Sequence, residues 1–565
     1  MTVENKQARS KQGFWQRAWP YLTIVLVTLI AHGFLLLMDW TFWEGAFNYP
    51  IIVSRDAAQM NIWTEQAIPI FIPFLLMLGA FANAFWASHF IAFLSFLAIG
   101  LLVYEICQTS KLMRRGESLW IALLTVLYPV FQMAVVNTVV AYIFGYALFL
   151  AGVLLALRME SAVGWRRWTQ RGLALLLLLA GLNFLQSLYV FYFGFLLFYL
   201  FFLLKREGLG LGEGVKKLAP RRLDLILLPF IAWGIRALFY PSAGYNSFKF
   251  DPQIILKWTV SFFNFGFWDP LSTLLTRHWW LTLLVFVVCA AFLYYLPKKL
   301  LRIAEEFDER PAHWLWLALS VMLFVMGFFA YVLVNKGLIR SVFADLPSDT
   351  DTRNTLLLGL PVAIFITAIA RWLVLRRRPV VMALGASLLV VFAAESALTH
   401  VQNYADWQIR AVKDRSFIAQ LAKMDEVQPY PVLWVHDEFP AGGIQFVEGR
   451  GVYAGEELQL IAHFAWPGGT PHSLIHNDYR KLSEQDFADR NLRYLAPGAG
   501  LENCQAELIL RRNPEAGSDL NVLAHYYYYK FFRGEEVLTG YLTGNYRLTL
   551  VFFEPSKVQP VEGCP

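Results

Sequence analysis

Charged residues are scarce in this chain of 565 residues. They make up 16% of its positions, whereas a soluble domain usually carries about 25%. So low a charge argues against a purely soluble enzyme. The hydrophobic content of 57% likewise argues against a disordered or fibrous chain.

The short motifs that identify many catalytic and nucleotide-binding proteins are also absent. The sequence contains no G-x-S-x-G, no Walker A phosphate loop, no H-E-x-x-H and no C-x-x-C. A nucleotide-driven pump needs a phosphate-binding loop, so we do not expect the chain to be one.

Long apolar runs rich in aromatic residues dominate the sequence instead. The mean hydropathy is +0.46, and 47 Phe, 25 Tyr and 20 Trp contribute to the apolar content. Runs of more than about 18 apolar residues are typical of membrane-spanning helices. The predicted fold class is therefore a polytopic α-helical membrane protein.

Eleven spanning helices are expected in a transmembrane lobe over residues 1–399. The uncharged stretch 173–204 is divided in two because both of its flanks are basic and Asn183, Gln186 and Ser187 mark a turn. The interrupted apolar stretch 57–80 is expected to lie at the membrane interface, since another crossing would invert every later loop. The expected spans are 20–38, 85–107, 119–136, 139–157, 172–185, 188–204, 223–240, 279–296, 313–334, 355–375 and 380–398.

Lysine and arginine are concentrated in alternate loops of this arrangement. The segments assigned to the cytoplasm carry 25 of them, and the outer loops before residue 400 carry 7. This asymmetry predicts a cytoplasmic N-terminus in a bacterial inner membrane and an extracytoplasmic C-terminal region. Because topology explains the basic residues, the net charge of +6 does not point to nucleic acid as a partner.

Residues 400–565 differ in composition from the rest, being mixed and polar. We expect them to form an α/β domain outside the cytoplasm, with helices at 404–425 and 455–464 and strands near 431–436, 506–511 and 545–553. Cys504 and Cys564 both fall there. In an oxidising compartment they either form a disulfide or remain two unpaired thiols.

The first outer loop, residues 39–84, carries carboxylates beside aromatic residues. Asp39 directly follows the first span, Glu44 comes five residues later, and Asp56 follows. A carboxylate at the membrane surface among apolar neighbours is partly desolvated and can be tuned as a general base. The alternative is that these residues only cap the end of a span at the interface.

Arginine and lysine residues are the candidates for binding a phosphate. Arg236 lies about one turn inside the outer end of its span, where a charge is costly and is either functional or directed to the headgroups. A later outer loop carries Lys336, Arg340 and Arg353. Guanidinium groups suit phosphate oxygens, although the loop could equally be a solvated segment of balanced charge.

A divalent metal is a weaker expectation. The same outer loop contains Asp349-Thr-Asp351, and paired carboxylates offer the hard oxygen ligands that such ions prefer. A lone D-x-D is weak evidence, so no residue is assigned as a metal ligand and the metal requirement stays open.

Together these features resemble the GT-C superfamily of integral-membrane glycosyltransferases. The resemblance rests on an odd number of spans with an internal N-terminus, a long first outer loop that begins with an acidic residue, and a polar outer domain at the end. The closest local match is His32-Gly-Phe-Leu-Leu-Leu-Met-Asp39, continued by Trp43-Glu44-Gly45. The loop that ends in Asp351-Thr-Arg353 is similar to the arginine-bearing loops of several members.

The resemblance implies an inverting transfer of a sugar from a polyprenyl-phosphate donor to an acceptor hydroxyl of a cell-surface glycan or glycolipid. It implies that a first-loop carboxylate, by position Asp39 or Glu44, acts as the base. It also implies that Arg236, Arg340 or Arg353 holds the donor phosphate. Asp56 and Lys336 are further candidates for contact with the donor or acceptor.

Other classes of membrane protein are the rival interpretations. A transporter or flippase for lipids or glycans would favour charges in mid-span and two related halves. A polyprenyl-dependent polysaccharide polymerase or ligase would favour a large basic outer loop in mid-chain. A non-enzymatic sensor that displays the outer domain would need no acidic first loop.

The topology is directly testable. A C-terminal fusion to alkaline phosphatase, which folds only outside the cytoplasm, should be active in cells because residues 400–565 are expected outside. An inactive phosphatase fusion, together with an active cytoplasmic reporter at the same position, would contradict the predicted topology.

Overall fold

The computed structural model divides the chain into two compact units. It describes residues 3–42, 68–131, 133–218, 220–240, 252–263, 313–333, 349–375, 379–427, 432–438, 455–467, 473–476 and 505–552, and also residues 45, 48, 52 and 283. The first unit, called here the helical unit, comprises residues 1–37, 57–134 and 139–401. The second, called the mixed unit, comprises residues 38–56, 135–138 and 402–565.

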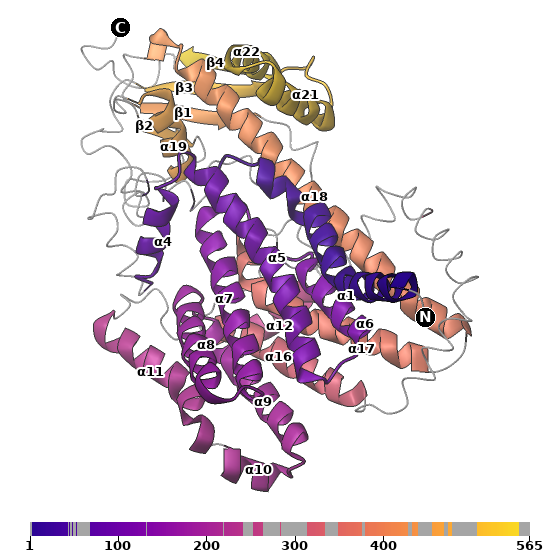
Figure 1. Cartoon of the computed structure of the whole chain (residues 1–565). Helices are drawn as coiled ribbons and strands as arrows, with labels where there is room; N and C mark the ends of the chain where they lie inside the picture. The colour runs from indigo at the N-terminus through magenta and orange to yellow at the C-terminus, as the bar shows by residue number, and fades with distance from the viewer. Residues whose placement is uncertain are drawn as a thin grey trace. The chain divides into compact units, whose positions relative to one another are not determined.

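The described part of the helical unit is built from helices alone (Figure 1). Its α-helices and 3-10 helices (η) are α1 (Val3–His32), η1 (Gly33–Leu37), α4 (Phe71–Leu78), α5 (Ala84–Ser110), α6 (Arg115–Val126), α7 (Asn137–Met159), α8 (Gly164–Phe184), α9 (Leu188–Glu207), α10 (Leu211–Leu218), η2 (Pro220–Arg222), α11 (Leu223–Phe239), α12 (Gln253–Phe263), α16 (His313–Leu333), η4 (Asp349–Leu358), α17 (Gly359–Leu375) and the first part of α18 (Pro379–Leu421).

Six helical segments of the described residues are long and apolar enough to cross a membrane. They are Ala18–Leu37, Ala84–Ser110, Asn137–Met159, Leu188–Glu207, Trp314–Leu333 and Asn354–Leu373. Each corresponds to one of the eleven expected spans. The chain is thus mostly helical with several candidate membrane crossings, as polytopic helical membrane proteins are.

The remaining five expected spans fare differently. Those at 172–185, 223–240 and 380–398 are helical, as α8, α11 and the start of α18, but they do not stand among the six. The span expected at 279–296 lies outside the described residues except for Leu283. In the interrupted stretch 57–80, α4 has only eight residues, which is too short for a crossing.

The span expected at 119–136 is wrong as a continuous helix. The helix α6 ends at Val126, ahead of Pro129, which has no N–H to donate and disfavours a helical residue before it. Two fully buried histidines replace lost helical hydrogen bonds. His32 Nε2 bonds to the Val126 carbonyl at 2.9 Å, and His400 Nε2 bonds to the Tyr128 carbonyl at 3.1 Å.

The division of the apolar stretch 173–204 is confirmed. The helix α8 ends at Phe184 and α9 begins at Leu188. Glycine lets α8 pack closely on α7, because a Cβ on Gly145 would lie 2.3 Å from the Phe184 Cβ and one on Gly181 would lie 3.0 Å from the Gly145 carbonyl oxygen. Such small-residue contacts are typical of helix packing in membranes.

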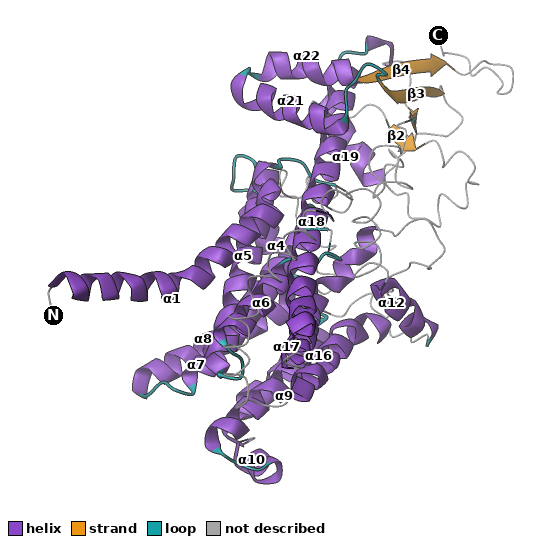
Figure 2. Ribbon diagram, turned by 90° about the vertical axis from the view of Figure 1, so that its right-hand side faces the viewer, coloured by secondary structure: helices purple, strands orange, loops and turns teal. Residues whose placement is uncertain are grey.

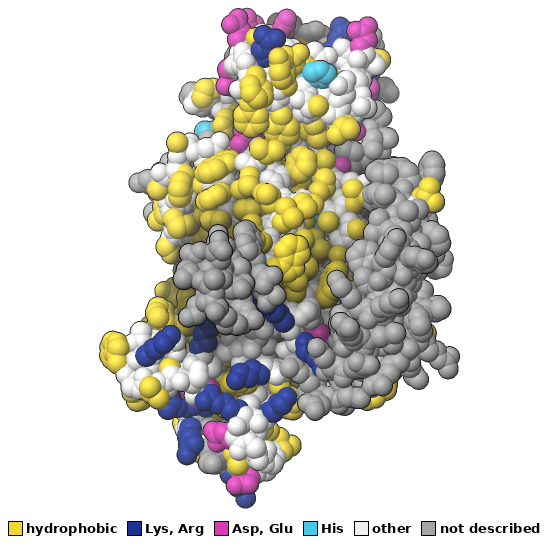
Figure 3. All heavy atoms as spheres, turned by 45° about the vertical axis from the view of Figure 1, so that its right-hand side comes forward, with side chains coloured by type: hydrophobic (Ala, Val, Ile, Leu, Met, Phe, Trp, Pro, Cys, Tyr) yellow, Lys and Arg dark blue, Asp and Glu magenta, His cyan; other side chains and the backbone are white. Residues whose placement is uncertain are grey.

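Ion pairs join the basic segments that were assigned to the cytoplasm. Glu160 Oε2 lies 2.5 Å from Arg222 Nη2, and the Tyr199 hydroxyl donates a hydrogen bond to Glu160 Oε1. Glu105 pairs with Arg158 and accepts a hydrogen bond from Tyr21. Segments near residues 21, 105, 158 and 222 therefore lie at one end of the helical unit. Figure 3 shows Lys and Arg side chains gathered at the end that carries α10. The side of the membrane that this end faces stays a prediction.

The mixed unit contains a four-stranded sheet (Figure 2). Its strands are β1 (Val432–Asp437), β2 (Ser473–His476), β3 (Gln505–Arg512) and β4 (Tyr546–Phe552), in the order β2-β1-β3-β4. The first three strands are parallel, and β4 runs antiparallel to β3. The accompanying helices are the last part of α18, η5 (Asp425–Val427), α19 (Gly455–Ala465), α21 (Asp519–Phe532) and α22 (Glu535–Asn545).

The sequence predicted these elements only in part. The strands expected at 431–436, 506–511 and 545–553 and the helix expected at 455–464 are present within one or two residues. The helix expected at 404–425 is the end of α18, which begins at Pro379. The strand β2 and the helices α21 and α22 were not predicted. Cys504 and Cys564 lie outside the described residues.

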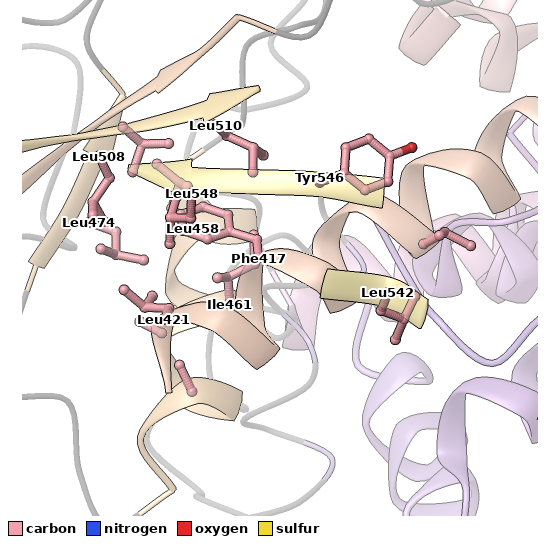
Figure 4. Close-up of a cluster of buried hydrophobic side chains, with 14 of the residues drawn as sticks. Phe417, Leu421, Leu458, Ile461, Leu474, Leu508, Leu510, Leu542, Tyr546 and Leu548 are labelled. Carbon is pink, nitrogen blue, oxygen red and sulfur yellow. The ribbon is translucent and has the colours of Figure 1, made fainter. Parts of the chain in front are cut away.

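One hydrophobic core holds the mixed unit together (Figure 4). Phe417 and Leu421 of α18 pack with Ile461 of α19, Leu508 of β3 and Leu548 of β4, and each of them is buried. Alternate residues of β3 face this core, as the period of a strand requires. The core therefore fixes the last turns of α18 against the sheet.

A buried ion pair adds a polar link between α18 and β1. Lys413 Nζ lies 2.5 Å from Asp437 Oδ2, and the two side chains are 5% and 0% exposed. Taking one charge from such a pair leaves the other buried and uncompensated, which costs about 3–5 kcal/mol.

We therefore expect Asp437→Ala to lower the melting temperature of the detergent-purified protein strongly. The double variant Lys413→Met/Asp437→Leu removes both charges and should recover most of that loss, since apolar replacements of a buried pair are often neutral. Equal losses in the single and double variants would contradict this role of the pair.

Candidate functional site

The carboxylate of Asp39 lies between two cationic side chains within the mixed unit. Lys530 Nζ donates a hydrogen bond to Asp39 Oδ2 at 2.8 Å. Arg415 Nη2 lies 2.8 Å from Asp39 Oδ1 and 3.3 Å from the Asp39 carbonyl oxygen. These three residues come from the start of the first loop, from α18 and from α21, so 491 sequence positions separate the outermost two.

Neighbouring contacts hold this cluster in place. Trp40 Nε1 donates a hydrogen bond to Asp414 Oδ2 at 3.0 Å, and the Arg415 guanidinium lies 5.7 Å from the centre of the Trp40 ring. Asp414 and Arg415 are adjacent on a helix whose end is fixed in the core by Phe417. The Asp39 segment is thus anchored at two successive residues.

The site is partly open to solvent. The side chains of Asp39, Arg415 and Lys530 are 12%, 22% and 20% exposed. The charged groups are therefore largely but not completely desolvated, and electrostatic interactions there are stronger than in bulk water.

Opposing effects set the ionisation of this cluster. Burial alone would raise the pKa of the Asp39 carboxyl, but the charges of Arg415 and Lys530 outweigh it, so the pKa of Asp39 lies below its usual value. Burial lowers the pKa of the Lys530 ammonium, and the attraction of Asp39 offsets this effect only in part. At neutral pH the carboxylate is therefore ionised.

Several polar atoms around Asp39 make no hydrogen bond to the described residues. They are Arg415 Nε and the hydroxyls of Tyr526 and Tyr527, and each of these atoms is buried. Tyr526 is completely buried, and both tyrosines act electrostatically on Asp39 and Arg415. The cluster therefore places a carboxylate that is already paired with two cations beside three buried donors that have no partner among the described residues.

The residues predicted from the sequence are distributed over the chain. Arg236 lies on α11 of the helical unit, where it interacts electrostatically with Tyr189. Arg353 lies in η4, and only its backbone is described. Its proximity to Asp39, and that of Arg236, stays a prediction.

Four predicted residues lie outside the described residues. They are Glu44, Asp56, Lys336 and Arg340. Among the residues that the structure describes, no group of three or more His, Cys, Asp or Glu side chains is placed to hold a metal ion.

Arg415 and Lys530 were missed by the sequence analysis. Both lie in the polar C-terminal region, where single cations are common and no motif distinguishes them. A weak signal was present for Lys530, because it follows the run Tyr526-Tyr-Tyr-Tyr529, and a lysine beside four tyrosines is unusual on a solvent-exposed helix. Their pairing with Asp39 depends on contacts between segments far apart in the sequence.

Comparison of the chain with protein-family models, with curated proteins and with solved structures found no match. The site therefore has to be interpreted from its own chemistry.

The ion cluster makes a prediction about pH. A carboxyl whose pKa is lowered on folding contributes stability above its unfolded pKa of about 3.9, and that contribution is lost as the pH falls through the folded value. Asp39→Asn leaves the positive charges of Arg415 and Lys530 without their carboxylate partner. We therefore expect it to lower the free energy of unfolding by about 2 kcal/mol at pH 7.

The measurement is the melting temperature of the wild type and of Asp39→Asn from pH 7 to pH 3. The difference should be constant down to about pH 5 and shrink below about pH 4. Asp425→Asn, at an exposed aspartate of the same unit, serves as the control and should melt like the wild type. A difference that is independent of pH would contradict the ion cluster.

Proposed function

We propose that this chain is an integral-membrane glycosyltransferase of the GT-C type, which transfers a sugar from a polyprenyl-phosphate donor to an acceptor hydroxyl on the outer face of the membrane. The observation that carries the proposal is the Asp39 carboxylate, which is ionised, partly exposed and directly beside two cations. The carboxylate can accept the proton of an acceptor hydroxyl, and the two cations can bind the donor phosphate.

Asp39 is assigned the role of general base. Its carboxylate is partly exposed and is held ionised by Arg415 and Lys530, so the hydroxyl of an incoming acceptor would donate to a second lone pair of one of its oxygens. In the transfer, the acceptor oxygen bonds to the anomeric carbon, and the bond from that carbon to the phosphate oxygen breaks. The acceptor proton passes to Asp39, and polyprenyl phosphate leaves with the bonding electrons.

Arg415 and Lys530 are assigned to the donor phosphate. Inverting displacement needs the base and the leaving group on opposite sides of the anomeric carbon. Arg415 presents Nη2 to Asp39, while its Nε makes no hydrogen bond to the described residues. The buried Nε cannot meet a leaving phosphate on the far side of the anomeric carbon, so Arg415 would stabilise that phosphate through its charge. The partly exposed Lys530 ammonium, which has three N–H groups, would donate to a phosphate oxygen.

With this assignment, the pKa of Asp39 depends on whether the donor is bound. The two cations hold the pKa of Asp39 below its usual value in the free site. A bound phosphate shares their charge, so the pKa of Asp39 should rise towards the range in which a carboxylate is an effective base. Arg236, Arg340 and Arg353 remain candidates for contact with the rest of the donor.

Asp39→Asn tests the role of the base. The purified protein is incubated with radiolabelled polyprenyl-phosphate hexoses and pentoses and a glycan or glycolipid acceptor fraction. The wild type should transfer label, and Asp39→Asn should lower kcat by about 100-fold or more. Donor binding should persist, because both cations remain.

The cations are tested separately with Lys530→Met. It should raise the donor KM by about tenfold or more, since a hydrogen bond to a charged group contributes about 1.5–3 kcal/mol. Lys423→Met, at an exposed lysine of the same unit, is the matched control and should leave KM unchanged. If Asp39→Asn transferred the sugar at the wild-type rate, the cluster would have only a structural role. Absence of transfer by the wild type from every donor would overturn the function.

A further inference from the structure

The helix α21 is apolar on two opposite faces. Its inner face carries Val522, Leu523 and Tyr526, which are 2%, 5% and 0% exposed in the core of the mixed unit. Its outer face carries Leu520 and Phe532, which are 78% and 76% exposed. A helix on the surface of a soluble domain normally carries charged and polar residues on its outer face.

The exposed apolar side chains form a continuous stripe. Residues 520, 528, 531 and 532 recur at helical spacing, and Tyr528 and Phe531 are 43% and 56% exposed. The rings of Tyr528 and Phe532 lie 5.8 Å apart, and those of Tyr527 and Phe531 are stacked at 6.0 Å. Ring contacts therefore order the aromatic end of the stripe, and Leu520 lies about two turns before it.

The charged residues beside this stripe are Asp519 at its start, Arg533 at its end, and Lys530, whose Nζ lies 5.8 Å from the centre of the Phe531 ring. The only acidic residue of α21, Asp519, lies 2.7 Å from Arg512 Nη1. At the other end the Arg533 guanidinium lies 5.6 Å from the centre of the Tyr528 ring, and its Nε donates a hydrogen bond to the Tyr528 hydroxyl. Glu535 and Glu536 follow on α22, beyond the end of the stripe.

We propose that the outer face of α21 lies in the headgroup region of the bilayer that the candidate spans of this chain cross. Phenylalanine and leucine would enter the boundary between headgroups and acyl chains, Tyr528 would stay at the level of the headgroups, and Arg533 would contact lipid phosphate. Aromatic and basic residues of this kind are typical of interfacial helices.

The composition of the stripe favours lipid over a sugar ligand. Sugars stack on aromatic rings but also need several hydrogen-bonding groups around the stacked face. The most exposed members, Leu520, Phe531 and Phe532, offer none, and their combined exposure is unusually large for a surface in water. An apolar phase that is always next to a membrane protein satisfies this surface without another protein.

The consequence concerns the opposite face of the same helix. Tyr526 and Lys530 belong to the Asp39 cluster, so an interfacial α21 would hold that cluster close to the level of lipid phosphates. The inference rests on the exposure of the stripe and does not depend on the proposed transfer reaction.

The test uses the full chain in nanodiscs with an environment-sensitive fluorophore on a cysteine. Phe532→Cys is labelled without reductant, and the wild type taken through the same labelling supplies the background from native cysteines. Glu515→Cys, at an exposed residue before α21, is the matched control. Quenching is measured with nitroxide-labelled lipid and, separately, with aqueous iodide.

Nitroxide lipid should quench the probe at position 532 several-fold more strongly than the probe at 515, and iodide should show the reverse order. Equal iodide quenching at both positions would overturn the proposal. Protection of position 532 that arises only on addition of soluble oligosaccharide, without quenching by lipid, would overturn it in favour of a glycan surface.

The double variant Phe531→Ser/Phe532→Ser provides a second measurement that does not depend on labelling. Its melting temperature in detergent should fall only slightly, because the rings lose their contacts with Tyr527 and Tyr528 but neither belongs to the core. In nanodiscs the fall should be larger, because the lipid contact is lost as well. An equal fall in detergent and in nanodiscs would also contradict the proposal.

Discussion

The pairing of the Asp39 carboxylate with Arg415 and Lys530 is the interaction on which the candidate site depends. It joins the first residues after a membrane span to two helices of the C-terminal region. A carboxylate that is only 12% exposed needs compensating charge, because desolvation penalises an ionised group. The same requirement makes the site sensitive to any anion that binds the two cations.

A related constraint shapes the helical unit. Backbone groups within a membrane must find partners inside the protein, since lipid offers none. The end of α6 at Val126 leaves carbonyl groups without helical partners, and the side chains of His32 and His400 reach them from distant helices. The two rings lie 4.5 Å apart, and His32 also stacks on Phe96. Two buried histidines thus make the interruption of the helix tolerable.

The two proposals made above place the candidate site and the proposed lipid-facing surface on one element, the helix α21. Helical geometry separates residues 526 and 530 from 528 and 532 by roughly half a turn, so one face serves the ion cluster and the other faces outward. A lipid-linked substrate carries its phosphate at the membrane surface. A helix that touches both the interface and the ion cluster would spare such a substrate from leaving the bilayer.

Hydropathy and loop charge were sufficient to predict a mostly helical chain, six candidate spans and the break at residues 185–187. These features depend on local composition, and the cost of exposing apolar or charged groups acts on each segment separately. The strands β1, β3 and β4 were also predictable, because short β-branched and aromatic runs bounded by turn residues are a local signal. Asp39 could be chosen as a candidate because it directly follows a span.

The partners of Asp39 and the end of α6 were decided only by tertiary structure. The sequence favoured Arg236, Arg340 and Arg353 as cations because they lie near predicted span ends, but nothing local connects Asp39 with Arg415 or Lys530. Likewise, the apolar residues 119–136 have the composition of a span, and only packing against His32 and His400 makes their interruption stable. Local composition specifies which groups must be satisfied, whereas the identity of the group that satisfies them depends on which distant segments the fold brings within hydrogen-bonding distance.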